Sequence, residues 1–271
     1  MTVIRFDCVS KFYPRYHRLR SGLKASLLQI RHTLRSQRVP PTVALDNVSF
    51  EVARHETIGI IGPNGSGKST ALALIAGVLN PQKGSIEVHG RIAPLLELGA
   101  GFHPELTGRE NIVLNAVLLG LTRREVSARL DSIIDFCELD SYLDEPIRTY
   151  SSGMIARLGF SIAVFLDHEI LLLDEVFAVG DLSFKAKCYA KIGELKQRGS
   201  TIVLVTHSIE EATQLCDRLI LLDGGKIVAD GRPDIVTGLY AEKAREHEQR
   251  RAASDPLTFP EKFALLNSLR V

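Results

Sequence analysis

The sequence has little cysteine, no long apolar run and almost no net charge. Its four cysteines lie far apart in the 271 residues and form no CxxC pair, which excludes a disulfide scaffold and gives no zinc-binding spacing. No apolar run reaches the ~18 residues that a membrane span needs. Arg5 and Asp7 interrupt the N-terminus where a signal peptide requires a continuous apolar stretch. We therefore expect a cytoplasmic protein with reduced thiols, which something else must hold at any membrane.

An excess of charge of either sign is also missing. Lys and Arg number 33, Asp and Glu number 32, and the formal net charge is +1. A protein that binds nucleic acid over its whole surface is usually more basic, so we expect no nucleic-acid partner. The composition, 45% hydrophobic and 24% charged, is ordinary for a globular protein and argues against disorder.

One segment breaks this charge balance. From Cys8 to Leu45 the chain contains eight basic residues and no acidic one. Leucine and isoleucine recur there at helical spacing, which predicts a basic amphipathic helix over residues 21–35. Two interpretations of the insertion at 14–40 stay open: a surface segment whose charge keeps it soluble, or an element that docks at an anionic membrane surface.

Hydrophobic periodicity predicts an α/β fold with a largely parallel sheet. Patterns typical of strands cover residues 3–9, 43–52, 57–61, 84–89, 92–98, 169–173, 200–206, 218–223 and 226–229. Patterns typical of helices cover residues 68–76, most of 108–166, 183–198, 208–215 and 232–251. Strands that alternate with helices in this way form βα units, whose strands lie parallel in one sheet.

A phosphate-binding loop is predicted at residues 62–69, which match GxxxxGK[ST] between a strand and a helix. Glycines allow the backbone N–H groups to wrap a phosphate, Lys68 places a positive charge near the β and γ phosphates, and the Ser69 hydroxyl can coordinate Mg²⁺. ATP and Mg²⁺ are therefore the expected ligands. The candidate nucleotide-binding residues here are Gly62, Pro63, Asn64, Gly65, Ser66, Gly67, Lys68, Ser69 and Thr70.

Two adjacent acids, Asp174 and Glu175, follow the apolar stretch 170–173. A carboxylate at the end of a strand next to the P-loop strand can hold Mg²⁺ through water, and this is the role expected for Asp174. Glu175 is expected to polarise the water that attacks the γ-phosphate. Paired acids at a strand end are common, and it is the preceding P-loop that makes this interpretation specific.

Further motifs resemble those of ABC ATPases in order and spacing. Residues 150–154 read Tyr-Ser-Ser-Gly-Met before a helix, where that family has its signature motif, and residues 178–181 stand where it has its D-loop. His207 follows a strand as the family's switch histidine does, and Tyr13 follows the first strand, where the family stacks an aromatic ring on adenine; Phe12 is the competing ring. The residues that the resemblance assigns to the nucleotide are Tyr13, Ser151, Ser152, Gly153, Asp181 and His207.

Two departures from the family pattern narrow the resemblance. Glu97 stands where the family has its Q-loop glutamine, and the signature reads Tyr-Ser-Ser-Gly-Met rather than Leu-Ser-Gly-Gly-Gln. Both features, together with residues 174–181 and 184–188, are similar to the ATPase subunits of bacterial polysaccharide exporters. Glu97 is then implied to bind Mg²⁺ or to position water, although it adds a negative charge beside the γ-phosphate.

The resemblance also implies an architecture. We expect a P-loop NTPase core and an antiparallel β part, with a helical subdomain over about 100–165. The antiparallel part would consist of residues 3–9, 43–52 and 84–89. A nucleotide-binding domain would then cover residues 1–231, followed by a short helical tail over 232–271.

Partners follow from the same resemblance. One chain cannot complete a site in this family, so two copies are expected to pair head-to-tail, with the signature loop of one facing the P-loop of the other. An integral membrane permease would turn that motion into transport of a lipid-linked glycan, with this chain peripheral at the cytoplasmic face of the inner membrane. Fewer than 90 residues separate Gly62 from Tyr150, too few for the coiled coil of DNA-repair ABC proteins. An ABC ATPase for another cargo stays open.

Overall fold

A computed structural model describes residues 1–14, 41–95, 99, 101–174 and 181–254. The basic helix expected at 21–35 lies outside the described residues, and so do the candidate site residues Glu97 and Glu175. All four cysteines are described, and all are free thiols. No helix within the described ranges is long and apolar enough to cross a membrane.

The expected antiparallel β part is confirmed as a sheet with strand order β2-β1-β4. Its strands are β1 (Thr2–Tyr13), β2 (Thr42–Ala53) and β4 (Lys83–Val88). β1 is longer than the predicted 3–9 because Phe12 and Tyr13 pair with β2. A register shift between Phe6 and Val9 and a left-handed Cys8 (φ 50°) interrupt the alternation on which the sequence prediction depended.

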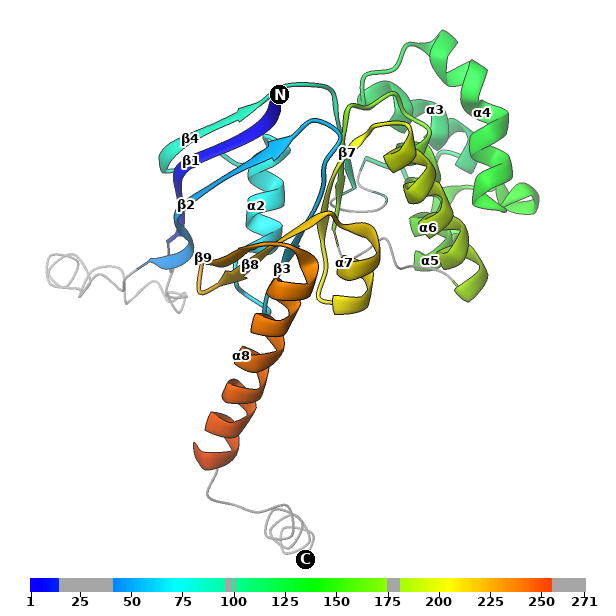
Figure 1. Ribbon diagram of the computed structural model, residues 1–271. Helices are drawn as coiled ribbons and strands as arrows, with labels where there is room; N and C mark the ends of the chain where they lie inside the picture. Colours follow the sequence, from blue (N-terminus) through cyan, green and yellow to red (C-terminus); the bar gives the residue numbers. More distant parts are fainter. Residues whose placement is uncertain (15–40, 96–98, 100, 175–180, 255–271) are drawn as a thin grey trace, which may run out of the picture.

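The second sheet has six strands in the order β5-β6-β7-β3-β8-β9 (Figure 1). The strands are β3 (Thr57–Ile61), β5 (Ile92–Leu95), β6 (Ile170–Leu173), β7 (Thr201–Val205), β8 (Arg218–Asp223) and β9 (Lys226–Gly231). All neighbours are parallel except β8 and β9. Every residue of β3, β6 and β7 is buried, as expected for parallel strands covered on both faces.

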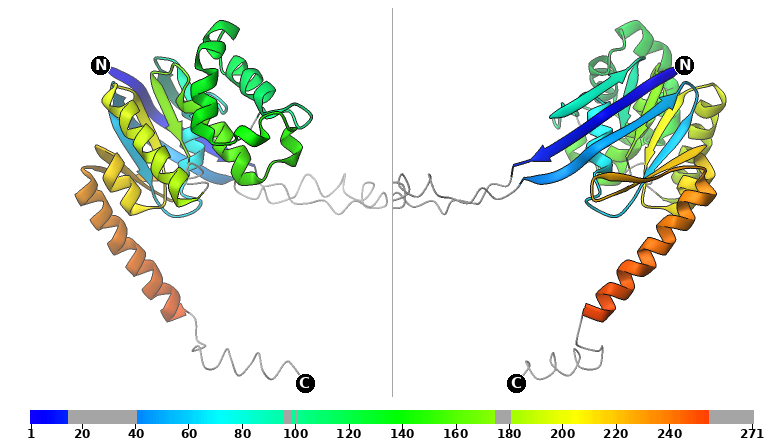
Figure 2. Two further views of the ribbon diagram at one scale, coloured as in Figure 1. Left: turned by 90° about the vertical axis from the view of Figure 1, so that its right-hand side faces the viewer. Right: turned by 60° about the vertical axis from the view of Figure 1, so that its left-hand side comes forward.

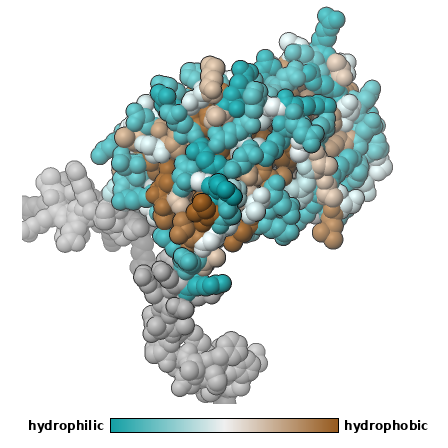
Figure 3. Space-filling view, viewed as in Figure 1, coloured by the Kyte–Doolittle hydropathy of each residue, from teal (hydrophilic) through white to brown (hydrophobic). Residues whose placement is uncertain are grey.

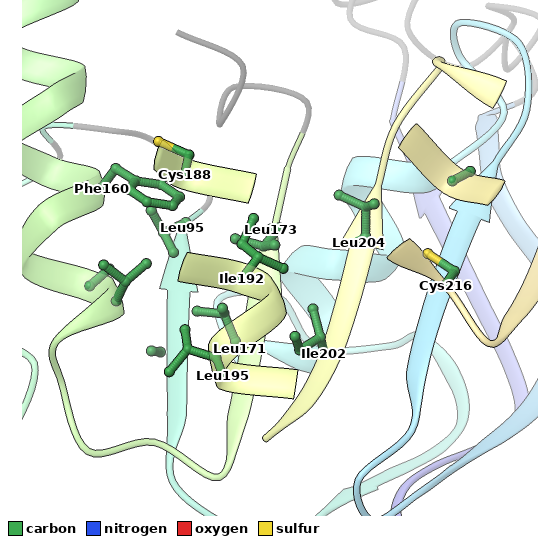
Figure 4. Packing of buried hydrophobic residues seen from close by; sticks show 14 of the residues in the cluster. Leu95, Phe160, Leu171, Leu173, Cys188, Ile192, Leu195, Ile202, Leu204 and Cys216 are labelled. Atoms are coloured by element: carbon green, nitrogen blue, oxygen red, sulfur yellow. The ribbon is translucent and has the colours of Figure 1, made fainter. Parts of the chain in front are cut away.

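Successive residues of these strands point to opposite faces, so the sheet separates two hydrophobic cores. On one face, residues of β6 and β7 pack against Phe160 of α5 (Ser152–Val164) and against Cys188, Ile192 and Leu195 of α6 (Leu182–Gln197) (Figure 4). The other face packs against the three-stranded sheet and α2 (Lys68–Ile75). The residues of β6 and β7 on the α6 face are Leu171, Leu173, Ile202 and Leu204.

The helical subdomain has a third core of its own and lies to one side of the sheets in Figure 1. It consists of α3 (Gly108–Leu118), α4 (Arg123–Cys137) and α5, with short 3₁₀ turns at Asp140–Tyr142 and Ile147–Thr149. Thr107 and Thr122 begin α3 and α4 in complete capping boxes with Glu110 and Glu125. This agrees with the helical region expected over about 100–165.

Two helices complete the described chain, α7 (Ile209–Leu215) and α8 (Pro233–Ser254). The first turns of α8 belong to the body of the protein: Val236 is 1% exposed, Tyr240 packs against the same core, and Lys243 pairs with Asp223 at 2.8 Å. The remainder of α8 extends away from the sheets in every view (Figure 2). The face in Figure 3 is mostly hydrophilic, with hydrophobic residues in small patches.

The division at residue 231 stays a prediction, and the packing of α8 suggests how to test it. A chain ending after Gly231 is expected to bind ATP but to be less stable, by about 1.5–3 kcal/mol, than one ending after Arg245, because it loses the buried Val236 side chain. Urea unfolding of the two chains measures the difference. Equal midpoints would show that α8 adds nothing to the core, and loss of ATP binding by a folded shorter chain would show that the nucleotide site needs α8.

Candidate nucleotide-binding site

The P-loop leaves the end of β3, which pairs in parallel with β7 on one side and β8 on the other. This central, buried strand fixes the origin of the loop, and α2 begins directly after it at Lys68. Gly67, the N-cap of α2, has φ 104°, a conformation that favours glycine. An added Cβ there would lie 2.3 Å from the Ala44 carbonyl oxygen, and one at Gly62 would lie 2.0 Å from the Leu222 carbonyl oxygen. Neighbouring backbone therefore leaves room only for glycine at both positions.

The side chains of the loop divide into buried anchors and exposed groups. Lys68 is 6% exposed, and its Nζ donates to the carbonyl oxygens of Gly62 at 2.9 Å and Pro63 at 3.2 Å. Ser66 is also buried. Ser69 is exposed and Thr70 is half-buried. The exposed residues at the tip of the loop are Pro63, Asn64 and Gly65.

Ser69 and Asp174 line one cavity of about 480 Å³, which also contacts Leu95, Gly99 and α5. Asp174 follows β6, and its N–H donates to the Leu95 carbonyl oxygen at 3.3 Å. The expectation that this strand lies next to the P-loop strand is wrong, because β7 lies between β3 and β6. The carboxyl ends of parallel strands share one edge of the sheet, so Asp174 still reaches the cavity that Ser69 lines.

His207 follows β7, the strand that lies between β3 and β6, and its side chain is exposed. Thr206 before it is 1% exposed, and Ser208 after it is the N-cap of α7. The residues that follow the neighbouring strands β3, β7 and β6 are thus the P-loop, His207 and Asp174, as the motifs require.

The aromatic candidates lie at the end of β1. Tyr13 is 39% exposed, with the Lys11 ammonium 5.7 Å from the centre of its ring. Phe12 is half-buried, and Gln82 exchanges two hydrogen bonds of 3.0 Å with its backbone. The greater exposure of Tyr13 favours it over Phe12 for stacking on a base.

The signature residues form the beginning of α5. Ser151 is its N-cap, with its Oγ accepting from the Met154 N–H at 3.2 Å, and Ser152 is exposed beside it. Gly153 is half-buried, and Met154 packs against the helical core. α5 contributes Gly159 and Ala163 to the cavity lining, whereas none of Ser151, Ser152 and Gly153 lines it.

Asp181 is the N-cap of α6, where its Oδ1 accepts from the Phe184 N–H at 2.9 Å. Its Oδ2 accepts from Arg157 of α5 at 2.7 Å. The Phe184 N–H first, and then Arg157, hold the pKa of this carboxyl below its usual value. Arg157 is 17% exposed. It also pairs with Glu138 at 3.4 Å and stacks over the Phe184 ring, so it joins α5 to α6.

Replacing Gly67 with alanine is expected to lower ATP affinity at least about 10-fold, because the new Cβ would collide with Ala44 and Leu45. Gly77→Ala is the matched control: Gly77 also has positive φ (71°), but an added Cβ has no neighbour within 4 Å. Both substitutions carry a conformational cost of about 1–2 kcal/mol, so their difference isolates the collision. Equal ATP affinities by calorimetry would contradict the close packing of this loop.

A P-loop at the end of a buried parallel strand, with an acid and a histidine after neighbouring strands, defines a P-loop NTPase. The ABC transporter family model matches residues 45–178. The chain is 48% identical over 240 residues, 89% of its length, to the O-antigen export system ATP-binding protein RfbB of Klebsiella pneumoniae, of which it covers 98%.

Further relatives and solved structures agree. The chain is 38% identical over 266 residues to the teichoic acids export ATP-binding protein TagH of Levilactobacillus brevis, covering 94% of this chain and 72% of that protein. A dimeric ATP-binding cassette in a post-hydrolysis state, bound to ADP and Pi, has the same fold, with a TM-score of 0.68 at 21% identity over 85% of this chain and 98% of that one. The chain belongs to the ABC transporter family, among the ATP-binding and ATP-hydrolysing subunits of polysaccharide exporters.

The sequence analysis missed the hydrogen bond between Thr206 and Glu211, which lies beside His207. The spacing Ser208-x-x-Glu211 was an available signal, since Ser or Thr three residues before Glu marks a helix N-terminus. This spacing agrees with the helix predicted over 208–215, but it does not give the direction in which the glutamate side chain turns.

Proposed function

We propose that the chain hydrolyses ATP to drive export of O-antigen or a similar lipid-linked polysaccharide through an integral membrane permease, working at the cytoplasmic face of the bacterial inner membrane. The observation that carries the proposal is the 48% identity to an O-antigen export ATP-binding protein over 98% of that relative. The match extends well beyond the phosphate-binding loop, which many unrelated NTPases share.

The P-loop would bind the phosphates of ATP. Its backbone N–H groups and the N-terminus of α2 favour negative charge, and Lys68 adds a cation that the loop itself holds in position. Tyr13 would stack on the adenine and His207 would contact the γ-phosphate from the end of β7. The P-loop and His207 both follow strands at the carboxyl edge of the six-stranded sheet, which supports these roles. Tyr13 instead comes from β1 of the three-stranded sheet.

Ser69 and Asp174 would hold Mg²⁺, with Glu97 as a further candidate ligand or a residue that positions water. A hydroxyl, a carboxylate and phosphate oxygens suit Mg²⁺, which prefers oxygen ligands and retains several waters. The fit is supported by the cavity that Ser69 and Asp174 both line. When bound, the metal would neutralise charge on the phosphates; Glu175 would polarise the attacking water.

Two copies of the chain would pair head-to-tail. Ser151, Ser152 and Gly153 of one copy would then face the nucleotide on the P-loop of the other, with Asp181 at the same interface. The position of this signature loop outside the cavity that Ser69 lines is consistent with a contribution to the other copy's site. ATP would hold the dimer closed, and hydrolysis would open it.

Deletion of the gene in the organism that encodes it tests the proposal. Surface polysaccharide is expected to disappear while lipid-linked glycan accumulates in the cytoplasm, and a plasmid carrying the natural chain restores export. A plasmid carrying Lys68→Ala provides the matched control, because the permease and the glycan enzymes remain unchanged. Normal surface polysaccharide in the deletion strain would assign the chain to another cargo.

A further inference from the structure

The Thr206 hydroxyl group makes hydrogen bonds on both sides of His207. Thr206, buried immediately before the histidine, donates its hydroxyl to Glu211 Oε2 at 2.7 Å. The Thr206 hydroxyl oxygen in turn accepts from the N–H of Ser208, immediately after the histidine, at 3.0 Å. The backbone on both sides of His207 is therefore tied to Glu211 through Thr206.

Glu211 behaves differently from the glutamates at the same helical position in α3 and α4. In α3 and α4 the glutamate three residues after the N-cap returns to the N-cap N–H, as Glu110 does at 2.9 Å and Glu125 at 2.7 Å. In α7 the Glu211 N–H donates to Ser208 Oγ at 3.3 Å, but Thr206 accepts the Ser208 N–H. The carboxylate of Glu211 is thus directed to Thr206 rather than used as a simple cap.

The second carboxylate oxygen reaches a different helix. The Tyr189 hydroxyl of α6 donates to Glu211 Oε1 at 2.6 Å. Burial and this hydrogen bond raise the pKa of Tyr189 above its usual value, so the phenol remains a donor at neutral pH. α6 begins at Asp181, which accepts from Arg157 of the signature helix. A continuous set of contacts therefore runs from α5 through α6 to the His207 loop.

We infer that Glu211 is a positioning residue, which holds His207 against the γ-phosphate and ties its loop to α6. The inference rests on the role proposed for His207. Hydrogen bonds from hydroxyl groups to an ionised carboxylate are short and about twice as strong as neutral ones. Two such bonds, one to each carboxylate oxygen, fix the Glu211 side chain. A displacement of α6 would move the His207 loop through Tyr189 and Glu211. It would move the signature helix α5 through Asp181 and Arg157.

Calorimetric affinities of the full chain for ADP and for a non-hydrolysable ATP analogue, both with Mg²⁺, test the inference. Glu211→Ala is expected to reduce the preference for the ATP analogue over ADP at least fivefold, because only the analogue has the phosphate that His207 contacts. The same substitution in a His207→Ala chain is expected to change the preference less than twofold, since the residue through which it acts is gone.

Matched variants separate positioning from a structural effect. Glu210→Ala removes the same charge from the neighbouring exposed residue of α7 and is expected to change the preference less than twofold. Thr206→Val should reproduce the loss and Thr206→Ser should not, because only serine retains the hydroxyl. Thermal unfolding shows whether each variant is folded. If Glu211→Ala does not fold, the two Thr206 variants still test whether the contact with Glu211 positions His207.

Three results would overturn the inference. Equal losses of affinity for both nucleotides would show that Glu211 merely stabilises the fold. An undiminished effect in the His207→Ala chain would show that it does not act through His207. An unchanged preference in His207→Ala alone would remove the role of His207, and this inference with it, while leaving ATP hydrolysis and the export function standing.

Discussion

Replacing Lys68 with alanine is expected to reduce ATP hydrolysis to background, a loss of about 10²–10⁴-fold. The Gly62 and Pro63 carbonyl oxygens hold the Lys68 ammonium at the P-loop, where we expect it to contact the β and γ phosphates. Hydrogen bonds to charged groups contribute about 1.5–3 kcal/mol each, and two such contacts account for the expected loss. Steady-state release of phosphate by the purified chain measures it.

Lys83→Ala is the control for this experiment, because it removes the same charge from an exposed position of β4. Its turnover should match that of the natural chain. Thermal unfolding of both variants establishes that they are folded. A folded Lys68→Ala chain with normal turnover would show that the loop at 62–69 does not bind the nucleotide that is hydrolysed.

The P-loop was predictable from the sequence because its geometry is local. The glycines, Lys68 and Ser69 lie within eight residues, and the strand before them and the helix after them are signalled by neighbouring residues. The structure adds why Gly62 and Gly67 are glycine: the carbonyl oxygens that exclude a side chain belong to Leu222 and Ala44, far away in the chain. Local conformation was predictable and the packing behind it was not.

The order of strands in the six-stranded sheet, in contrast, was not predictable from the sequence. Asp174 was assigned to a strand next to β3, yet β7, which follows both in the sequence, inserts between them. Strand order depends on long-range pairing, which no short pattern encodes. The functional prediction was unaffected by this error, because parallel strands present their carboxyl ends at a common edge whatever their order.

Side-chain contacts between distant elements were the least predictable. Arg157 lies 24 residues before Asp181, and Tyr189 lies 22 residues before Glu211, with no spacing rule that relates either pair. α8 gives a similar lesson. The sequence predicted a helix over 232–251, but no short pattern indicated that Val236 and Tyr240 near its start pack into the core.

Replacing Glu175 with glutamine is expected to slow ATP hydrolysis by about 10²–10⁴-fold while ATP still binds, because glutamine keeps the shape of the side chain and loses the base. If ATP holds two copies together, the variant should accumulate as a dimer with ATP and Mg²⁺ and remain a monomer with ADP. Single-turnover hydrolysis and size-exclusion chromatography in each nucleotide measure the two effects separately.

Glu169→Gln is the matched control, since the same change is made just before β6 instead of just after it. Glu169 pairs with Arg54 at 2.8 Å on the exposed surface, where an ion pair contributes about 0–1 kcal/mol, so turnover should remain normal. A Glu175→Gln chain that hydrolyses ATP at the natural rate would remove Glu175 as the base. One that hydrolyses slowly but stays monomeric with ATP would keep the base and contradict the head-to-tail dimer, so the two parts of the proposed mechanism can fail independently.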